Sequence, residues 1–253
     1  MSKEKTVTAC LIIIGNEILS GRTQDANLAY LAKWLNEEAG IQLTETRVIL
    51  DIEDTIVETV NECRSKFDYV FTTGGIGPTH DDITSPSVAK AFGLEWELHP
   101  EAHELLKEYY GPEGLTSARA RMAFTPKGAE LVENPISKAP GFQVENVFVM
   151  AGIPVVMQAM LDSLKHRLTG GKPVRSRSVR VHLPESQIAT TLRELQEANA
   201  NSDIGSYPFY HKGKGGTSIV VRSTDEDLID TIVDTVYRHA FELGGDPEFE
   251  DAS

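Results

Sequence analysis

Cysteine is scarce in this sequence: only Cys10 and Cys63 occur, and they stand outside any spacing typical of metal ligands. This argues against a disulfide framework and against a cysteine-based metal site. Cys10 falls in an apolar segment that predicts the first strand, and Cys63 falls in a predicted helix. We therefore expect two buried thiols, since a reducing compartment disfavours a disulfide between them.

Positive charge is also scarce, with 24 Lys and Arg against 38 Asp and Glu, which gives a net charge of −14. A general nucleic-acid binder needs the opposite balance, so no nucleic-acid partner is expected. No apolar run approaches the roughly 20 residues that span a bilayer, and the first residues lack a signal-peptide pattern. We expect a cytoplasmic protein with no membrane partner.

The first half of the chain alternates strand and helix patterns. Ser85 followed by Pro86 is typical of a helix start, with a capping hydroxyl before a proline in the first turn. The alternation predicts a parallel sheet with helices on both sides, whose strand ends and loops share one edge. Strands are predicted over 7–14, 43–50 and 68–73, and helices over 26–39, from Asp51 or Asp54 onward, and from Ser85 to about Gly93.

The second half predicts two regions of different character. Helices are expected over 101–110, 116–124 and 154–168, with a short strand over 147–150 between them. A β-α-β-β-α order after the linker at 169–173 predicts a smaller α+β domain. We therefore expect a large α/β domain at 1–168, a small α+β domain at 174–243 and an acidic tail at 244–253.

The segment "TTGGIGPTHDDIT" (72–84) follows the third predicted strand. Its glycines allow positive φ and close ligand approach, and successive backbone amides form an anion-binding nest. Asp81 and Asp82 would repel a phosphate unless a divalent cation such as Mg²⁺ lies between them and the phosphate oxygens. The pattern indicates a phosphate and metal site, with a tight turn carrying solvated aspartates as the alternative. It matches neither a Walker loop nor the dinucleotide GxGxxG spacing.

A second polar loop, "GNEILSGRTQDAN" (15–27), follows the first predicted strand. Glu17 is an acid at the same sheet edge, and Ser20, Thr23 and Asn27 offer neutral hydrogen bonds. In isolation this loop reads as a helix-capping segment. Two polar loops on one edge favour a single shared cleft.

Together these segments resemble the molybdopterin-binding-like domain of CinA (competence/damage-inducible) proteins. The resemblance covers about residues 6–168, and weakly the small domain to about 243. It rests on "GNEILSG", "TTGGIGPTHDD", "NPISKAPGF" and "AGIPVVM". It implies a three-layer α/β sandwich of the MogA type with a mostly parallel sheet, and a pocket for a phosphorylated pterin or nucleotide. Some members are described as metal-dependent pyrophosphatases acting on ADP-ribose, and many carry a separate deamidase domain, which is not expected here.

The resemblance also has departures. Val156 stands where the family has a glutamate, which puts hydrolysis in doubt. Asn16 stands where the family often has Asp or Thr, and Lys138 where it often has Thr. Family members also lead us to expect a homo-oligomer, either a dimer or a trimer.

Two readings of the site stay open. As an enzyme, Asp81 and Asp82 hold Mg²⁺ with help from Glu17, and His80 is either a general base or a loop histidine without a role. As a binding module, the same cleft holds molybdopterin or a nucleotide without turnover. A purely structural protein would leave the glycine loop unexplained. In either functional reading, the ligand-binding set is Gly74, Gly75, Gly77, Pro78, Thr79, Asn27 and Gly152.

Overall fold

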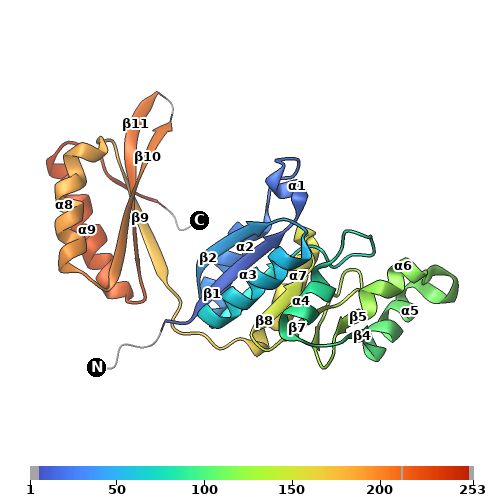
Figure 1. Cartoon of the computed structure of the whole chain (residues 1–253). Coiled ribbons are helices and arrows are strands. Elements are labelled where there is room, and N and C mark those ends of the chain that lie inside the picture. The colour runs from blue at the N-terminus through green and yellow to red at the C-terminus, as the bar shows by residue number, and fades with distance from the viewer. Residues whose placement is uncertain (1–5, 212, 251–253) are drawn as a thin grey trace. The chain divides into compact units, whose positions relative to one another are not determined.

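The computed structural model describes residues 6–211 and 213–250. The chain forms two compact units, residues 1–171 and 172–253, and each is described by itself (Figure 1). Within the described residues, no helix is long and apolar enough to cross a membrane.

The first unit is built on a six-stranded sheet with the order β2-β1-β3-β8-β7-β6. Strands β2, β1, β3 and β8 are parallel neighbours, while β7 is antiparallel to β8 and β6 is antiparallel to β7. The sheet is therefore mostly parallel, as predicted. The strands are β1 Thr8–Ile14, β2 Gln42–Ile49, β3 Tyr69–Thr73, β6 Glu130–Val132, β7 Gly141–Val144 and β8 Val147–Met150.

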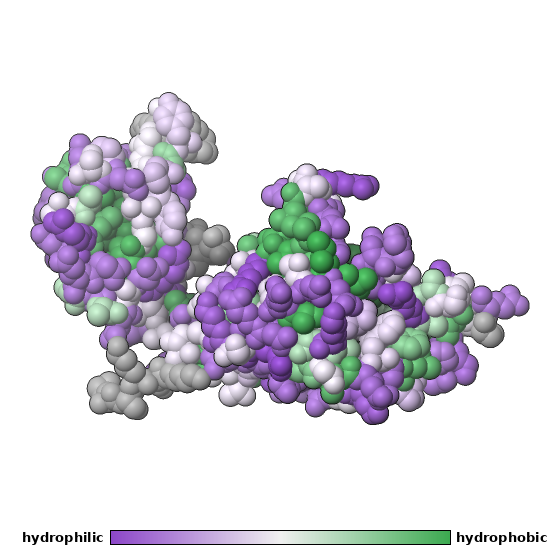
Figure 2. Space-filling view, viewed as in Figure 1, coloured by the Kyte–Doolittle hydropathy of each residue, from purple (hydrophilic) through white to green (hydrophobic). Residues whose placement is uncertain are grey.

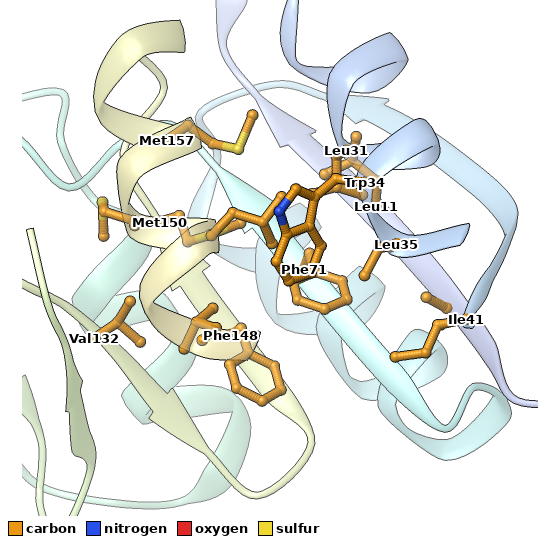
Figure 3. Packing of buried hydrophobic residues seen from close by; sticks show 14 of the residues in the cluster. Leu11, Leu31, Trp34, Leu35, Ile41, Phe71, Val132, Phe148, Met150 and Met157 are labelled. Carbon is orange, nitrogen blue, oxygen red and sulfur yellow. The ribbon is translucent and has the colours of Figure 1, made fainter. Parts of the chain in front are cut away.

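Helices cover both faces of this sheet, because the central strands are apolar on both sides. Successive side chains of β1 point to opposite faces: Leu11 enters one buried cluster and Cys10 the other. On the first face, Phe71 and Phe148 stack with ring centroids 5.3 Å apart beside Trp34 (Figure 3). The first face is covered by α2 Asn27–Trp34, its continuation Leu35–Ala39, and α7 Pro154–Leu164; the second by α3 Glu53–Lys66 and α4 Thr84–Phe92. The predicted three-layer α/β sandwich is confirmed.

The chain between α4 and β6 forms a small layer beside α4. Strands β4 and β5 pair antiparallel within it. A separate apolar cluster of Ala102, Leu106 and Ala123 holds α5 against the chain that leads into β5. The elements of this layer are β4 Trp96–Leu98, α5 Pro100–Gly114, α6 Ser117–Ala120, a 3₁₀ turn at Arg121–Ala123, and β5 Phe124–Pro126. Elsewhere in the first unit, a second 3₁₀ turn at Lys165–Arg167 follows α7.

The predicted cap of α4 is wrong. The helix begins at Thr84, so Ser85 lies inside its first turn and Pro86 follows it there. The Ser85 hydroxyl donates to the Phe124 carbonyl at 2.8 Å and accepts from the Trp96 indole at 2.9 Å. Tertiary partners therefore take the hydroxyl that the local pattern assigned to capping.

The second unit is an antiparallel sheet with the order β10-β11-β9-β12. Helices α8 and α9 pack their apolar residues against β9 and β11 in one cluster. The predicted α+β class is confirmed, and a strand, β12, lies within the predicted tail, whose residues 251–253 fall outside the described chain. The elements are β9 Arg175–Val181, α8 Glu185–Ala198, β10 Ser202–His211, β11 Lys214–Ser223, α9 Glu226–Glu242 and β12 Glu248–Glu250.

The parallel strands of the first unit all end at one edge of its sheet. The loops after β1, β2, β3 and β8 therefore meet there, together with the short helix α1 Asn16–Leu19. This edge is where ligands bind in open α/β sheets.

Candidate functional site

The glycine loop depends on the absence of side chains at Gly74 and Gly75, and Gly77 leaves room for the Asp82 carboxylate. Gly74 (φ 102°) and Gly75 (φ 67°) adopt conformations that favour glycine. A Cβ on Gly74 would lie 2.1 Å from the carbonyl oxygen of Ile14, and one on Gly75 would lie 2.2 Å from the Thr84 hydroxyl. A Cβ on Gly77 would lie 2.7 Å from a carboxylate oxygen of Asp82. The loop is thus folded tightly against β1, α4 and its own aspartate.

Backbone amides along this loop are available to a ligand. Of the described residues, none accepts a hydrogen bond from the amides of Gly75, Ile76 or Gly77. The loop carbonyl of Gly75 instead accepts from the Thr84 amide at 3.0 Å, which fixes the entry into α4. Free consecutive amides beside a helix start are an anion-binding arrangement.

Asp81 and Asp82 converge on the single side-chain hydroxyl of Thr79. The Thr79 oxygen lies 2.6 Å from Asp81 Oδ1 and 2.5 Å from Asp82 Oδ2, and the Thr79 amide also donates to Asp82 Oδ2 at 2.7 Å. The hydrogen bond from Thr79 lowers the pKa of Asp81 below its ordinary value. One hydroxyl hydrogen can serve only one of the two carboxylates. The cluster therefore has more acceptors than donors, which favours a cation beside it.

Asp51 is a further acid at this edge, which the sequence patterns assigned only to a helix start. Its carboxylate accepts from the Asn16 amide at 2.8 Å, so it connects the loop after β2 to α1. Partial burial raises the pKa of Asp51 above its ordinary value, and the negative charges of Glu17 and Asp81 act in the same direction. Asp51 follows the second strand, and the loops after parallel strands meet at one edge of a sheet. This position is the sequence signal that could have identified Asp51 as part of the site.

Asp51→Asn is expected to raise the melting temperature at pH 7 by a few degrees. The folded-state pKa of Asp51 is raised, so its stabilising contribution is complete below its ordinary pKa of about 4 and is lost as the pH rises through the folded value. Asparagine keeps an acceptor for the Asn16 amide and removes the repelled charge. Thermal unfolding at pH 7 and below pH 4 checks this, because the difference between variant and wild type should vanish at the lower pH. A variant that is less stable at pH 7 would contradict it.

Asn27 and Gly152 join the start of α2 to the loop before α7. The Asn27 side-chain amide donates to the Gly152 carbonyl at 2.8 Å, and a Cβ on Gly152 would lie 3.2 Å from Gly74 Cα. The Asn27 side chain is 4% exposed, yet its Oδ1 has no partner among the described residues. A buried amide oxygen without a donor is costly, and a bound water or ligand could supply one.

An aromatic pocket opens beside the glycine loop on the α4 side. Arg121 reaches across it, with its guanidinium 5.5 Å from the Trp96 ring centre and 3.4 Å from the Asp82 carbonyl oxygen. Trp96, on β4, carries no motif in the sequence. Arg121 belongs to "SARARM" (117–122), where its spacing of two from Arg119 on a predicted helix argues against a shared phosphate clamp. The pocket is lined by Ile76, Gly77, Asp82, Ser85, Pro86, Trp96, Arg121, Met122, Phe124, Pro140 and Phe142.

Comparisons with known proteins decide the family. Residues 10–170 match the family described as "Probable molybdopterin binding domain". The chain belongs to this family. Residues 173–241 match a second family, described as "FAD synthase, middle domain".

Similar proteins place this member among the CinA-like molybdopterin-binding proteins. The crystal structure of the protein CinA with unknown function from Thermoplasma acidophilum superposes with a TM-score of 0.60 and 33% identity, covering 64% of this chain and 98% of that one. A protein of Pyrococcus furiosus is 36% identical in an alignment of 242 positions, gaps included, that covers 88% of this chain and 93% of the relative. A protein of Pyrobaculum calidifontis is 36% identical in an alignment of 212 positions, gaps included, that covers 79% of this chain and 80% of the relative. Membership supports a module that binds a nucleotide or a pterin.

The structure of this family member does not bring all predicted site residues into one group. Within residues 6–211 and 213–250, no three His, Cys, Asp or Glu side chains are placed to hold one metal ion, so Glu17 does not complete a set with Asp81 and Asp82. Glu17 instead folds back over Gly15, where a Cβ would lie 2.6 Å from its carboxylate. The His80 ring is 97% exposed, with Nδ1 3.8 Å from Asp81 Oδ1.

Pro78 and Val156 differ in their exposure to solvent. Pro78 is exposed on the loop surface next to Thr79. Val156, where the family resemblance expects a glutamate, is 5% exposed and packs into the core under α7. In the described structure Val156 therefore stabilises the core and does not line the candidate ligand site.

Apolar surface surrounds the same edge. Figure 2 shows hydrophobic atoms gathered beneath α1. The large apolar side chains exposed on the segments at this edge include Leu19 of α1, Leu28 of α2, Leu50 and Ile52 after β2, and Ile153 and Val155 at the start of α7. An apolar rim beside a polar loop suits a ligand with a flat ring or a protein surface.

Proposed function

We propose that the cleft binds a phosphorylated nucleotide or pterin and, with a divalent cation, cleaves the diphosphate linkage of ADP-ribose-like nucleoside diphosphates. The observation that carries this proposal is the convergence of Asp81 and Asp82 on one Thr79 hydroxyl, directly beside free loop amides. The amides attract an anion and the two acids attract a cation. A metal-bound phosphate satisfies both.

The donor set fits a hard cation of the Mg²⁺ type. Mg²⁺ is commonly held by one or two carboxylates, with waters and substrate phosphate oxygens completing its shell, so the absence of a third acid in the described cluster is compatible with it. Asp81 and Asp82 would hold the ion, which would supply positive charge to the phosphoryl oxygens. The amides of Gly75 and Gly77 would bind and orient a phosphate. Thr79 keeps the two carboxylates in register through its hydroxyl and its amide.

The aromatic pocket supports a ligand with a flat ring. Trp96 and Phe124 are partly exposed beside the glycine loop, Phe142 is buried beneath them, and Arg121 adds a fixed positive charge. The pocket has room for about one water molecule (10 Å³), so a base or pterin ring would lie over its mouth rather than inside it. In that position its phosphate would be close to Gly77 and Asp82, which belong to the loop and line the pocket. The aromatic pocket would therefore contact the ring, and the adjoining glycine loop would bind the phosphate.

A non-catalytic molybdopterin- or nucleotide-binding module is the second candidate, linked to molybdenum-cofactor metabolism. It is favoured by Val156, which is buried in the core where the resemblance expects an acid. In this case the same amides and pocket hold the ligand, and no group activates water. The match of the second unit to the middle domain of FAD synthase is compatible with either candidate.

Incubation of the purified full chain with ADP-ribose and Mg²⁺, Mn²⁺ or Co²⁺ separates the two candidates. We expect AMP release that depends on the metal and stops with EDTA, measured by chromatography. A rise in melting temperature with ADP-ribose or a pterin, without product, would indicate the binding module. If neither product nor a thermal shift occurs with any phosphorylated ligand, both proposals fail.

A further inference from the structure

Cys10 and Cys63 lie side by side in the folded chain, although they are far apart in sequence. Cys10 is on β1 and Cys63 is on α3, and their sulfur atoms are 3.6 Å apart. Both are fully buried, among Ile56, Val60 and Val70 in the cluster between α3 and the sheet. This pair is separate from the glycine loop and from the acids at the sheet edge.

The two thiols are not equivalent. The Cys10 thiol lies within hydrogen-bonding distance of the Cys63 sulfur (3.6 Å) and of the Leu11 carbonyl oxygen (3.8 Å), and its one hydrogen serves one of them at a time. The hydrogen bond to Cys63, and to a smaller extent burial, raises the pKa of Cys10 above its ordinary value. Accepting that hydrogen bond lowers the pKa of Cys63, and the positive charge of Arg47 acts in the same direction. Cys63 is therefore the sulfur better placed to react as a thiolate, with Cys10 next to it as the second thiol.

We propose that Cys10 and Cys63 form a reversible redox pair, in which a hydroperoxide converts the two thiols of the folded chain into an intramolecular disulfide between β1 and α3. The Cys63 thiolate attacks one peroxide oxygen, breaks the O–O bond and becomes a sulfenic acid, releasing hydroxide that takes a proton to form water (an alcohol from an organic peroxide). Cys10 sulfur then attacks Cys63 sulfur, and the displaced hydroxide leaves as water with the Cys10 proton. Two electrons pass from the sulfurs to the peroxide.

The geometry requires only a small movement. A disulfide bond is about 2.0 Å long, so the sulfur atoms must approach by about 1.6 Å, which side-chain rotation and a slight shift of α3 can provide. The chain contains no other cysteine, so no third thiol competes within one molecule. Because both thiols are buried, peroxide reaches them through local opening of α3 from the sheet.

The test treats the native full chain with hydrogen peroxide, removes the peroxide with catalase, and unfolds the protein in an alkylating reagent. We expect both thiols to be protected from alkylation, a cross-linked peptide containing Cys10 and Cys63 by mass spectrometry, and full recovery of both thiols with dithiothreitol. Peptide mapping separates this product from methionine oxidation. The cross-link closes a long loop and should raise the melting temperature of the oxidised protein by about 5 °C or more.

Cys10→Ala and Cys63→Ala are the matched controls. Each keeps one thiol, so peroxide should give neither the cross-linked peptide nor the thermal shift. The proposal is overturned if both wild-type thiols remain alkylatable after peroxide treatment, if the cross-link joins two molecules, or if sulfinic and sulfonic acids form instead. An equal rise in melting temperature in the single-cysteine variants would also overturn it, since the cross-link could not then be its cause.

Discussion

Asp82→Asn is expected to reduce metal-dependent hydrolysis of ADP-ribose by roughly 100-fold or more, because a charge that stabilises the reacting phosphoryl group is removed. In the wild type the Thr79 amide donates to Asp82 Oδ2 at 2.7 Å. Asparagine still offers an oxygen to this amide, so the loop should keep its shape. The variant should also lose most of the rise in melting temperature that Mg²⁺ gives the wild type. Initial rates and thermal shifts at several Mg²⁺ concentrations measure both effects.

Asp234→Asn is the matched control for this variant. Asp234 is an exposed residue of α9 in the second unit, and its replacement removes the same unit of negative charge from an acidic chain. Its rate and its Mg²⁺ response should equal those of the wild type. If Asp82→Asn behaves like Asp234→Asn, the loop aspartates do not hold the cation and the proposed hydrolysis loses its basis.

The fold of the first unit could be predicted because its signals are local and repeated. Apolar strands buried on both faces alternate with helices, and this pattern has few solutions other than a mostly parallel sheet between helical layers. The start of α2 illustrates a local signal: the sequence predicts a helix from residue 26, the helix begins at Asn27, and the Asp25 carboxylate accepts from the Leu28 amide at 2.9 Å. Ser85 illustrates one that failed, because Phe124 and Trp96, distant in sequence, bind its hydroxyl instead. Strand β12 was missed because three residues with two glutamates carry no strand pattern.

The candidate site also contains a part that local sequence signals predict and a part that they do not. The glycine loop and its two aspartates are contiguous, so their chemistry can be predicted from the sequence alone. Asp51, Trp96 and Arg121 reach the site from separate elements, and only the packing of those elements places them there. The approach of Cys10 to Cys63 is of this second kind, since it depends on how α3 lies across β1.

Gly74→Ala is expected to lower the free energy of unfolding of the first unit by roughly 3 kcal/mol or more, which corresponds to a fall in melting temperature of about 10 °C. Gly74 has φ 102°, and its Cβ would lie 2.1 Å from the carbonyl oxygen of Ile14. That oxygen belongs to the backbone at the end of β1 and cannot rotate away as a side chain could. The Gly74 amide also donates to the Met150 carbonyl at 3.2 Å, so relief of the clash would disturb β8 as well.

Gly93→Ala separates the two causes of this loss. Gly93 ends α4 with φ 65°, and apart from its own helix and chain neighbours no heavy atom of the described residues lies within 4 Å of the position of its Cβ. Its replacement should therefore cost only the positive-φ penalty of about 1 kcal/mol. Chemical denaturation of both variants measures the difference, and ligand binding should be lost in Gly74→Ala and kept in Gly93→Ala. Equal losses of stability would mean that backbone strain alone sets the cost, and that the end of β1 is free to move away from the glycine loop.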